Sequence, residues 1–141
     1  MKCFFCKDNK DLLIKKYKYW TILIHPYQCY LGRCMIKLNR HMIDFFDSNE
    51  EEKKELLEIM KQLKTRLNDL FKPDLFNYAS LGNQIRHLHI HIIPRYKDKR
   101  IFENIGFFDK RWNNIHSPYE KVKLSPSVLN ELKNQIRRGL K

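Results

Sequence analysis

The sequence predicts an α+β domain built on an antiparallel sheet, and two observations support this fold class. Segments with the pattern of strands come in two groups, and each group is followed by one segment with the pattern of an amphipathic helix. The strands within a group are close enough in sequence to pair in an antiparallel manner. A chain of 141 residues fits one compact domain with its own core and leaves little room for a second.

Four segments are predicted to be strands. Residues 22–25 lie in a β-branched and aromatic stretch that a proline ends. Residues 33–38 alternate between two sets of side chains, as a half-buried strand does. Residues 75–80 and residues 85–94 flank Gly82, which predicts a turn and therefore a hairpin.

Two segments are predicted to be helices. Between Ser48 and Pro73, leucine and methionine fall on one face at a spacing of three to four residues. Ser48 can cap this helix, and Glu51 completes a capping box. The second helix follows Ser125, a capping residue, and has a proline at its first position. Residues 97–123 are rich in aromatic side chains without a period, so we expect mostly loop there.

The formal net charge of +12 favours anionic partners, either polyphosphate nucleotides or nucleic acid. The basic residues are spread along the chain, so a solvated surface of high charge is the alternative. No apolar run reaches the length of a membrane span, and the N-terminus is too polar after Phe5 for a secretory signal. We therefore expect a soluble, cytoplasmic protein without a membrane partner.

Three of the six histidines, His87, His89 and His91, alternate with apolar residues in the stretch RHLHIHIIPR. On a strand they share one face, and the apolar residues between them face a core. On a helix they would scatter, because each two-residue step turns by about 200°. Neighbouring histidines on a strand lie roughly 6.6 Å apart, which is too wide for two of them to share a metal ion easily. We therefore expect separate roles for the three; a polar, solvent-facing strand is the alternative.

A row of histidines is suited to chemistry at phosphorus. A neutral imidazole acts as a covalent nucleophile near neutral pH when a neighbouring group holds its other nitrogen as N–H. Attack on phosphorus would give a phosphohistidine-type intermediate. Flanking histidines and amides can then hold the phosphate oxygens.

The run from His87 to Ile93 resembles the His-φ-His-φ-His-φ-φ signature of the histidine triad (HIT) superfamily, where φ is an apolar residue. The stretches KCFFCK, LGRCMIKLNRHM and LGNQIRHLHIHIIPRY also resemble its bacterial and archaeal nucleotide hydrolases. The resemblance covers residues 3–96. It implies a homodimer and a HIT-like α+β fold with an antiparallel sheet of about five strands, one long helix and, here, a C-terminal helix. We therefore divide the chain into a HIT domain over residues 1–100 and a C-terminal extension over residues 101–141, packed on the same domain.

The resemblance also implies catalytic and nucleotide-binding residues. His89 is the nucleophile that takes the nucleotidyl group, and a backbone carbonyl is expected to orient it. His91 contacts the transferred phosphate and assists the leaving group. Family members carry a polar pair with glycine just before the triad, so Asn83 is the phosphate-contact candidate and Gln84 a second one. The remaining nucleotide-binding candidates are Asn77 and His25.

Three further positions differ from the family or lie outside its motifs. Arg33 stands where the family usually has a histidine, and an arginine there can hold phosphate or point away. His25 falls near the position where relatives have a ribose-binding polar residue. His116 is isolated in the C-terminal extension, so we expect it at the surface.

Cys3 and Cys6 form a C-x-x-C pair, which in a cytosolic chain is more often metal-binding or redox-active than a disulfide. In HIT relatives with such a pair, a histidine after the second strand and the first triad histidine complete a zinc site. Those positions match His41 and His87. The resemblance thus implies a structural zinc ion that fixes the N-terminus against the sheet. A pair of buried or reactive thiols is the alternative.

The resemblance implies an enzyme that hydrolyses or transfers nucleotides at the α-phosphate through a nucleotidyl-histidine intermediate. The expected substrates are dinucleoside polyphosphates, such as diadenosine polyphosphates, or nucleoside phosphoramidates. The charge of +12 leaves open the same chemistry on adenylated nucleic-acid ends, which predicts steeply salt-dependent binding. A zinc-stabilised nucleotide-binding module without turnover is a third hypothesis.

Overall fold

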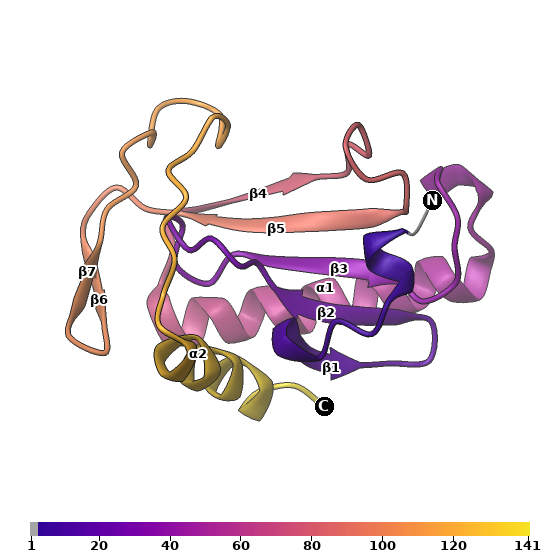
Figure 1. The fold of residues 1–141 in the computed structure, drawn as a ribbon, viewed down its shortest axis with the longest axis horizontal. Helices are drawn as coiled ribbons and strands as arrows, with labels where there is room; N and C mark the ends of the chain where they lie inside the picture. The colour runs from indigo at the N-terminus through magenta and orange to yellow at the C-terminus, as the bar shows by residue number, and fades with distance from the viewer. Residues whose placement is uncertain (1–2) are drawn as a thin grey trace.

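The structure, a computed structural model that describes residues 3–141, has a five-stranded antiparallel sheet with one long helix across one face (Figure 1). The strand order is β1-β2-β3-β5-β4, and each neighbouring pair is antiparallel. The α+β fold class is therefore confirmed. The strands of the sheet are β1 (Leu13–Lys16), β2 (Trp20–Ile24), β3 (Cys34–Leu38), β4 (Leu75–Ala79) and β5 (His89–Arg95).

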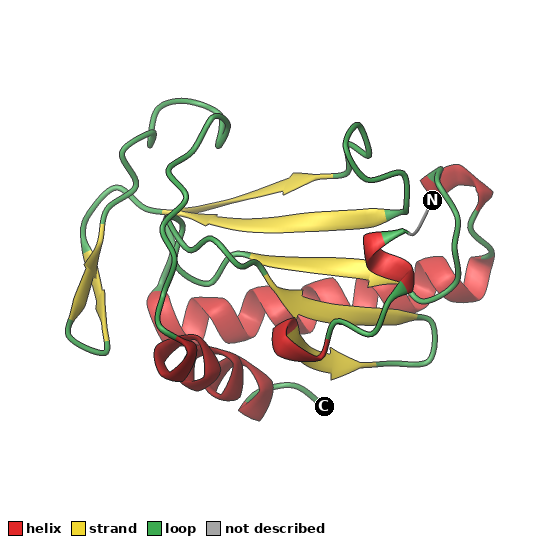
Figure 2. Ribbon diagram, in the orientation of Figure 1, coloured by secondary structure: helices red, strands yellow, loops and turns green. Residues whose placement is uncertain are grey.

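The helical elements lie on both sides of the sheet (Figure 2). The long helix lies behind the sheet in Figure 1, and the N-terminal arm, residues 3–12, lies in front of it. The other elements are the helices α1 (Glu50–Phe71) and α2 (Pro126–Arg138) and the 3-10 helices η1 (Phe4–Cys6), η2 (Lys10–Leu12) and η3 (Phe45–Asp47). Within residues 3–141 no helix has the combined length and apolar character that crossing a membrane requires.

The two faces of the sheet carry different side chains, as strand alternation requires. Ile22, Ile36 and Ile90 stand in register across β2, β3 and β5 and belong to the core beneath α1. Each such buried side chain contributes about 1.5–3 kcal/mol. The opposite face carries Leu23 and Met35, and the N-terminal arm covers them with a buried phenylalanine. Because His89 and His91 share the parity of this second face, the sheet presents them on the side away from α1.

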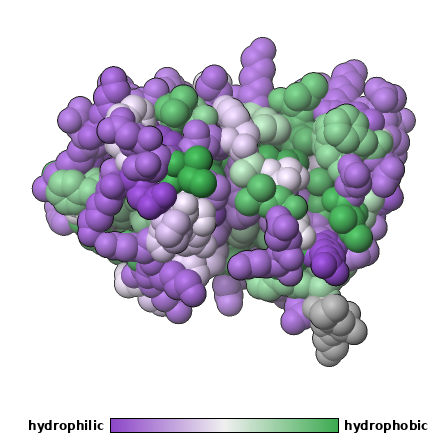
Figure 3. Space-filling view, turned by 90° about the horizontal axis from the view of Figure 1, so that it is seen from above, coloured by the Kyte–Doolittle hydropathy of each residue, from purple (hydrophilic) through white to green (hydrophobic). Residues whose placement is uncertain are grey.

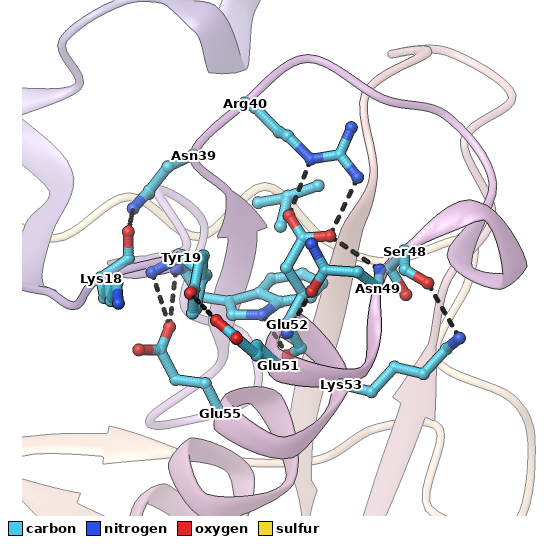
Figure 4. Close-up of polar contacts among 12 residues, drawn as sticks. Lys18, Tyr19, Asn39, Arg40, Ser48, Asn49, Glu51, Glu52, Lys53 and Glu55 are labelled. Carbon is cyan, nitrogen blue, oxygen red and sulfur yellow. Dashed lines mark hydrogen bonds and ion pairs between the residues drawn. The ribbon is translucent and has the colours of Figure 1, made fainter.

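Helix α1 begins one residue later than the sequence predicted. Asn49 is the N-cap, because its side chain accepts a hydrogen bond from the Glu52 amide at 2.8 Å and Glu52 accepts one from the Asn49 amide at 2.9 Å (Figure 4). The expected cap, Ser48, instead donates its hydroxyl to the carbonyl of Phe45 in η3. The capping box is therefore real, but Ser48 and Glu51 do not form it. The helix ends at Phe71, before the proline that was expected to stop it.

Acidic residues of α1 attach the helix to one end of the sheet, where β2 begins and β3 ends (Figure 4). Glu55 accepts hydrogen bonds from the backbone amides of Tyr19 and Trp20, at 2.8 and 3.0 Å. Glu52 accepts two hydrogen bonds from the guanidinium of Arg40, at 2.8 and 2.9 Å. The second contact holds the chain just after β3, at the residue that precedes His41.

The segment that was expected to be mostly loop contains a small hairpin, formed by β6 (Arg100–Phe102) and β7 (Ile105–Phe107). Its two turn residues, Glu103 and Asn104, have φ values of 51° and 61°. Two consecutive positive φ angles are typical of the tight turns that match the twist of a hairpin. The sequence did not reveal these strands because three residues are too few to show an alternating pattern. Strand β1, with four residues, was also too short to show an alternating pattern.

The C-terminal extension packs on the same core as the sheet. Helix α2 is capped by Ser125 as expected, since its hydroxyl accepts a hydrogen bond from the Val128 amide at 3.3 Å. Leu132 and Ile136 of α2 are buried in the cluster that also contains the side chains beneath α1.

The surface is largely hydrophilic, with hydrophobic patches on the face seen from above in Figure 3. Strand β4 forms one edge of the sheet and pairs with β5, although the connection between them is longer than a hairpin turn at Gly82. The exposed large apolar side chains include Ile43, Phe46, Leu57, Leu75, Tyr78 and Leu81.

Candidate functional site

Four side chains that are far apart in the sequence meet at one end of the sheet. They are Cys3, Cys6, His41 and His87, and their ligand atoms all lie within 4.8 Å of one another. The Nδ1 atoms of the two histidines are 3.2 Å apart. The Sγ atom of Cys6 lies 3.3 Å from Nδ1 of His41 and 3.4 Å from Nδ1 of His87. The group can therefore hold a metal ion.

The donors and their spacing fit zinc. A tetrahedral zinc ion with bonds of about 2.3 Å to sulfur and about 2.0–2.1 Å to nitrogen separates two nitrogens by about 3.3 Å and sulfur from nitrogen by about 3.5 Å. Nε2 of His87 lies 2.7 Å from the carbonyl oxygen of Leu38, which can only accept, so Nε2 carries the proton. Nδ1 of His87 is thus a free lone pair that faces the cysteines, in the tautomer a metal ligand needs.

Lys37 holds the N-terminal arm beside this group. Its Nζ donates to the carbonyl oxygens of Phe5 and Lys7, at 2.9 and 3.0 Å, and to the side chain of Asn9 at 2.7 Å. Burial lowers the pKa of Lys37. These contacts place Phe5 over the sheet, with its ring centroid 4.5 Å from that of His89.

His89 is oriented by a backbone carbonyl. Its Nδ1 lies 2.6 Å from the carbonyl oxygen of His87, so Nδ1 carries the proton and donates it. Nε2 is therefore the atom with a free lone pair. Burial lowers the pKa of His89, which keeps this lone pair unprotonated near neutral pH.

His91 stands next to His89, and His25 stands next to His91; both are also held neutral. Burial, followed by the charge of Arg33, lowers the pKa of each to about 3. Nη2 of Arg33 lies 3.5 Å from Nδ1 of His91, and the Tyr27 amide donates to Nδ1 of His25 at 3.0 Å. Because a guanidinium only donates, Nδ1 of His91 accepts, so its Nε2 carries the proton and can donate to a ligand. Nδ1 of His25 also lies 3.1 Å from the carbonyl oxygen of Tyr27, and these contacts fit either tautomer.

A cavity of about 390 Å³, here called the triad cavity, brings these residues together. His89, His91 and His25 line it from the sheet, and the β4–β5 connection adds Asn83 and Gln84. Five of the six catalytic and nucleotide-binding residues predicted from the sequence thus lie around one space. The sixth residue, Asn77, does not line it.

Asn77 is engaged elsewhere on the same face of the sheet. Its side-chain oxygen accepts a hydrogen bond from Nη1 of Arg95 at 2.8 Å. Asn77 therefore helps to hold a buried arginine rather than the contents of the cavity.

The C-terminal extension supplies residues that sequence reasoning missed. His116 was expected at the surface; it is half-buried and lines the triad cavity, and its backbone carbonyl accepts a hydrogen bond from the Tyr30 hydroxyl at 2.6 Å. Tyr119 also lines the cavity, and its ring centroid lies 4.4 Å from the guanidinium carbon of Arg33. No local pattern marks these residues, because only the path of the chain brings residues 116–119 back over the sheet.

Comparison with known proteins identifies the family. A model of the HIT domain family matches residues 8–98, which is more than half of the chain. The chain therefore belongs to the HIT domain family, as its histidine motif indicated.

Two relatives of this chain are uncharacterised HIT-like proteins. The protein from Borreliella burgdorferi is 28% identical over 134 residues, which cover 86% of this chain and 91% of the relative. The protein from Mycoplasma genitalium is 28% identical over 86 residues, 57% of this chain and 61% of the relative. This second match thus spans less than two thirds of the relative's length.

Solved structures of low sequence identity have the same fold. A histidine triad protein from Sinorhizobium meliloti has a TM-score of 0.77 at 16% identity, over 92% of this chain and 89% of that one. A diadenosine triphosphate hydrolase from Plasmodium falciparum has a TM-score of 0.68 at 18% identity, over 93% and 77%. A zinc-bound histidine triad family protein from Mycobacterium smegmatis has a TM-score of 0.62 at 12% identity, over 92% and 83%.

Proposed function

We propose that this protein is a nucleotide hydrolase or transferase that acts at the α-phosphate through a covalent nucleotidyl-His89 intermediate. One observation carries the proposal: the 2.6 Å hydrogen bond from Nδ1 of His89 to the His87 carbonyl leaves Nε2 as a free nucleophile in the triad cavity. Family membership and the likeness in fold to a diadenosine triphosphate hydrolase support it. The expected substrates are dinucleoside polyphosphates or nucleoside phosphoramidates.

The reaction has two displacements at one phosphorus. In the first, Nε2 of His89 attacks the α-phosphorus, and the bond from phosphorus to the leaving group breaks with its electron pair going to the leaving group. A phosphate leaving group departs as an anion, whereas an amine leaving group takes a proton from solvent and departs as the neutral amine. In the second, water attacks the phosphorus, the phosphorus–nitrogen bond breaks and the water proton passes to solvent. A nucleoside monophosphate leaves, and His89 is neutral again.

The neighbouring residues bind and orient the substrate. The Nε2–H group of His91 is a donor beside His89, so it can donate a hydrogen bond to an oxygen of the transferred phosphate or to the leaving group. Asn83 and Gln84 offer amide donors for other phosphate oxygens, and His25 is the candidate for the ribose.

We further propose that Cys3, Cys6, His41 and His87 hold a structural zinc ion. The donor set is closed, so no coordination position remains for chemistry. The ion would link the N-terminal arm to the residue whose carbonyl orients His89.

The test compares wild type with His89→Asn on diadenosine triphosphate and on adenosine 5′-phosphoramidate, with released monophosphate measured by chromatography. We expect wild-type turnover and a loss of about 10³-fold or more in the variant, because no other side chain replaces the nucleophile. Substrate labelled at the α-phosphate should leave label on quenched wild type and none on the variant. Thermal unfolding of both proteins controls for folding. Turnover near wild type in His89→Asn would refute the assignment.

The net charge of +12 supports a second candidate, removal of adenylate from nucleic-acid ends by the same chemistry. An adenylated oligonucleotide added to the same assay separates the two substrates. The second candidate requires oligonucleotide binding that weakens steeply with salt, and no affinity at low salt excludes it. Binding of dinucleotide without release of monophosphate would instead indicate a binding module.

A further inference from the structure

Two arginines are buried on the face of the sheet that carries the triad, and they differ in their partners. Arg95 is 1% exposed and Arg33 is 2% exposed. Arg95 donates to both carboxylate oxygens of Asp109, at 2.7 and 3.0 Å, to Asn77 and to two backbone carbonyls. The charge of Arg95 is therefore compensated by partners within the protein.

Arg33 has no such compensation. Its Nε and Nη1 atoms are buried without a hydrogen-bond partner, and Nη2 has a single contact at 3.5 Å, to His91. No carboxylate forms an ion pair with it among residues 3–141. A buried cation without a counter-ion is costly, so the free protein lacks a partner that this side chain requires.

Arg33 lines the triad cavity, so a ligand bound there can supply the missing partner. No aspartate or glutamate lines that cavity among the residues that the structure describes. The other ionisable side chains there are histidines and two tyrosines, so an anionic ligand meets donors and one full positive charge.

The position of Arg33 indicates which part of a substrate it meets. It contacts His91, whose ring centroid lies 5.1 Å from that of His89. An anion on Arg33 therefore lies next to the group that His89 attacks rather than at the nucleophile itself. The ring of Tyr119 covers one side of the guanidinium, with its centroid 4.4 Å from the guanidinium carbon.

We propose that Arg33, His91 and Tyr119 form a subsite for a phosphate of the leaving group, so that the protein prefers nucleotides whose leaving group is itself a phosphate over those with a neutral amine. The inference rests on the proposed function for its kinetic consequence. The phosphate in this subsite is joined to the α-phosphate through one bridging oxygen. Its negative charge grows as the bond to the α-phosphorus breaks, and Arg33 stabilises that charge.

The kinetic test uses Arg33→Met, which keeps much of the side chain's apolar length and removes its charge. The substrates are diadenosine triphosphate and adenosine 5′-phosphoramidate. The leaving group of the first is a nucleoside diphosphate, and the leaving group of the second is ammonia. We expect kcat/KM to fall about 100-fold for the first and less than about threefold for the second. Arg86→Met is the matched control, since Arg86 is exposed, forms no ion pair with any of residues 3–141 and lies outside the triad cavity. An equal loss on both substrates, or no loss on either, overturns the proposal.

A binding test stands even if neither substrate is turned over. Inorganic pyrophosphate should raise the thermal unfolding temperature of wild type clearly and that of Arg33→Met little or not at all. Without ligand, Arg33→Met should unfold at or above the wild-type temperature, because the substitution removes an uncompensated buried charge. If Arg33→Met without ligand is less stable than wild type, Arg33 is structural and the proposal fails. The proposal also fails if pyrophosphate raises the unfolding temperature of Arg33→Met as much as that of wild type. Failure of the proposed function alone appears as absent turnover with the pyrophosphate effect intact.

Discussion

Removal of the proposed zinc ion should destabilise the protein by detaching its N-terminal arm. Two of the arm's attachments lie near the sheet, the ligands Cys3 and Cys6 and the contacts of Lys37 around the buried Phe5. A metal present at 1,000 times its dissociation constant stabilises the fold by about 4 kcal/mol. Burial of one large apolar side chain contributes about 1.5–3 kcal/mol. This contribution is lost as well as the binding energy of the metal only if Phe5 leaves the sheet.

We therefore expect Cys3→Ser, or treatment of wild type with a chelator, to lower the free energy of unfolding by about 2–4 kcal/mol. For a chain of this length that corresponds to a fall of about 5–15 °C in the unfolding temperature. Zinc content is measured by elemental analysis of purified protein, and stability by thermal and urea unfolding. Cys29→Ser is the control, because Cys29 is half-buried but does not belong to the ligand group.

Two results would refute this reasoning. Cys3→Ser that retains one zinc ion per chain would exclude Cys3 as a ligand. Wild type that contains zinc but unfolds at the same temperature after the metal is removed would show that the arm does not depend on it.

Two further predictions concern pH and assembly. His25 and His91 have a pKa of about 3 in the folded protein and about 6.5 when unfolded, so the unfolded state binds more protons below pH 6.5 and stability falls as the pH drops. The free energy of unfolding in urea should be lower at pH 5 than at pH 7 by up to about 2 kcal/mol per histidine. The total loss should be smaller in His25→Gln, and equal stability at the two pH values would contradict the prediction. The homodimer expected from the family should form through the edge strand β4, which exposes Leu75 and Tyr78. Light scattering should then give a dimer mass for wild type and a monomer for Tyr78→Lys, and a monomeric wild type would exclude the dimer.

Local patterns in the sequence predicted most of the helices and strands of the fold. The period of α1, the alternation in β3 and β5 and the cap of α2 all depend on residues close together in the chain, and the structure has each of these elements. The exact cap of α1 was missed because Ser48 and Asn49 are both good capping residues. Only the turn before the helix, where Phe45 takes the Ser48 hydroxyl, decides between them.

The candidate site divides in the same way. The sequence by itself determined that His89 and His91 share a face of a strand, because alternation is a property of any extended chain. The tertiary structure decided which atoms are free: the His87 carbonyl fixes the proton of His89 on Nδ1, and the Leu38 carbonyl turns His87 toward the cysteines.

Only the tertiary structure decided the fate of the two buried arginines. Nothing near Arg33 or Arg95 in the sequence shows that Asp109 pairs with Arg95 and that Tyr119 covers Arg33. Those partners lie on a segment that carries no periodic pattern and returns over the sheet. The physical reason is that local sequence determines the direction of a side chain along a strand, whereas its charge partner depends on where distant parts of the chain pack.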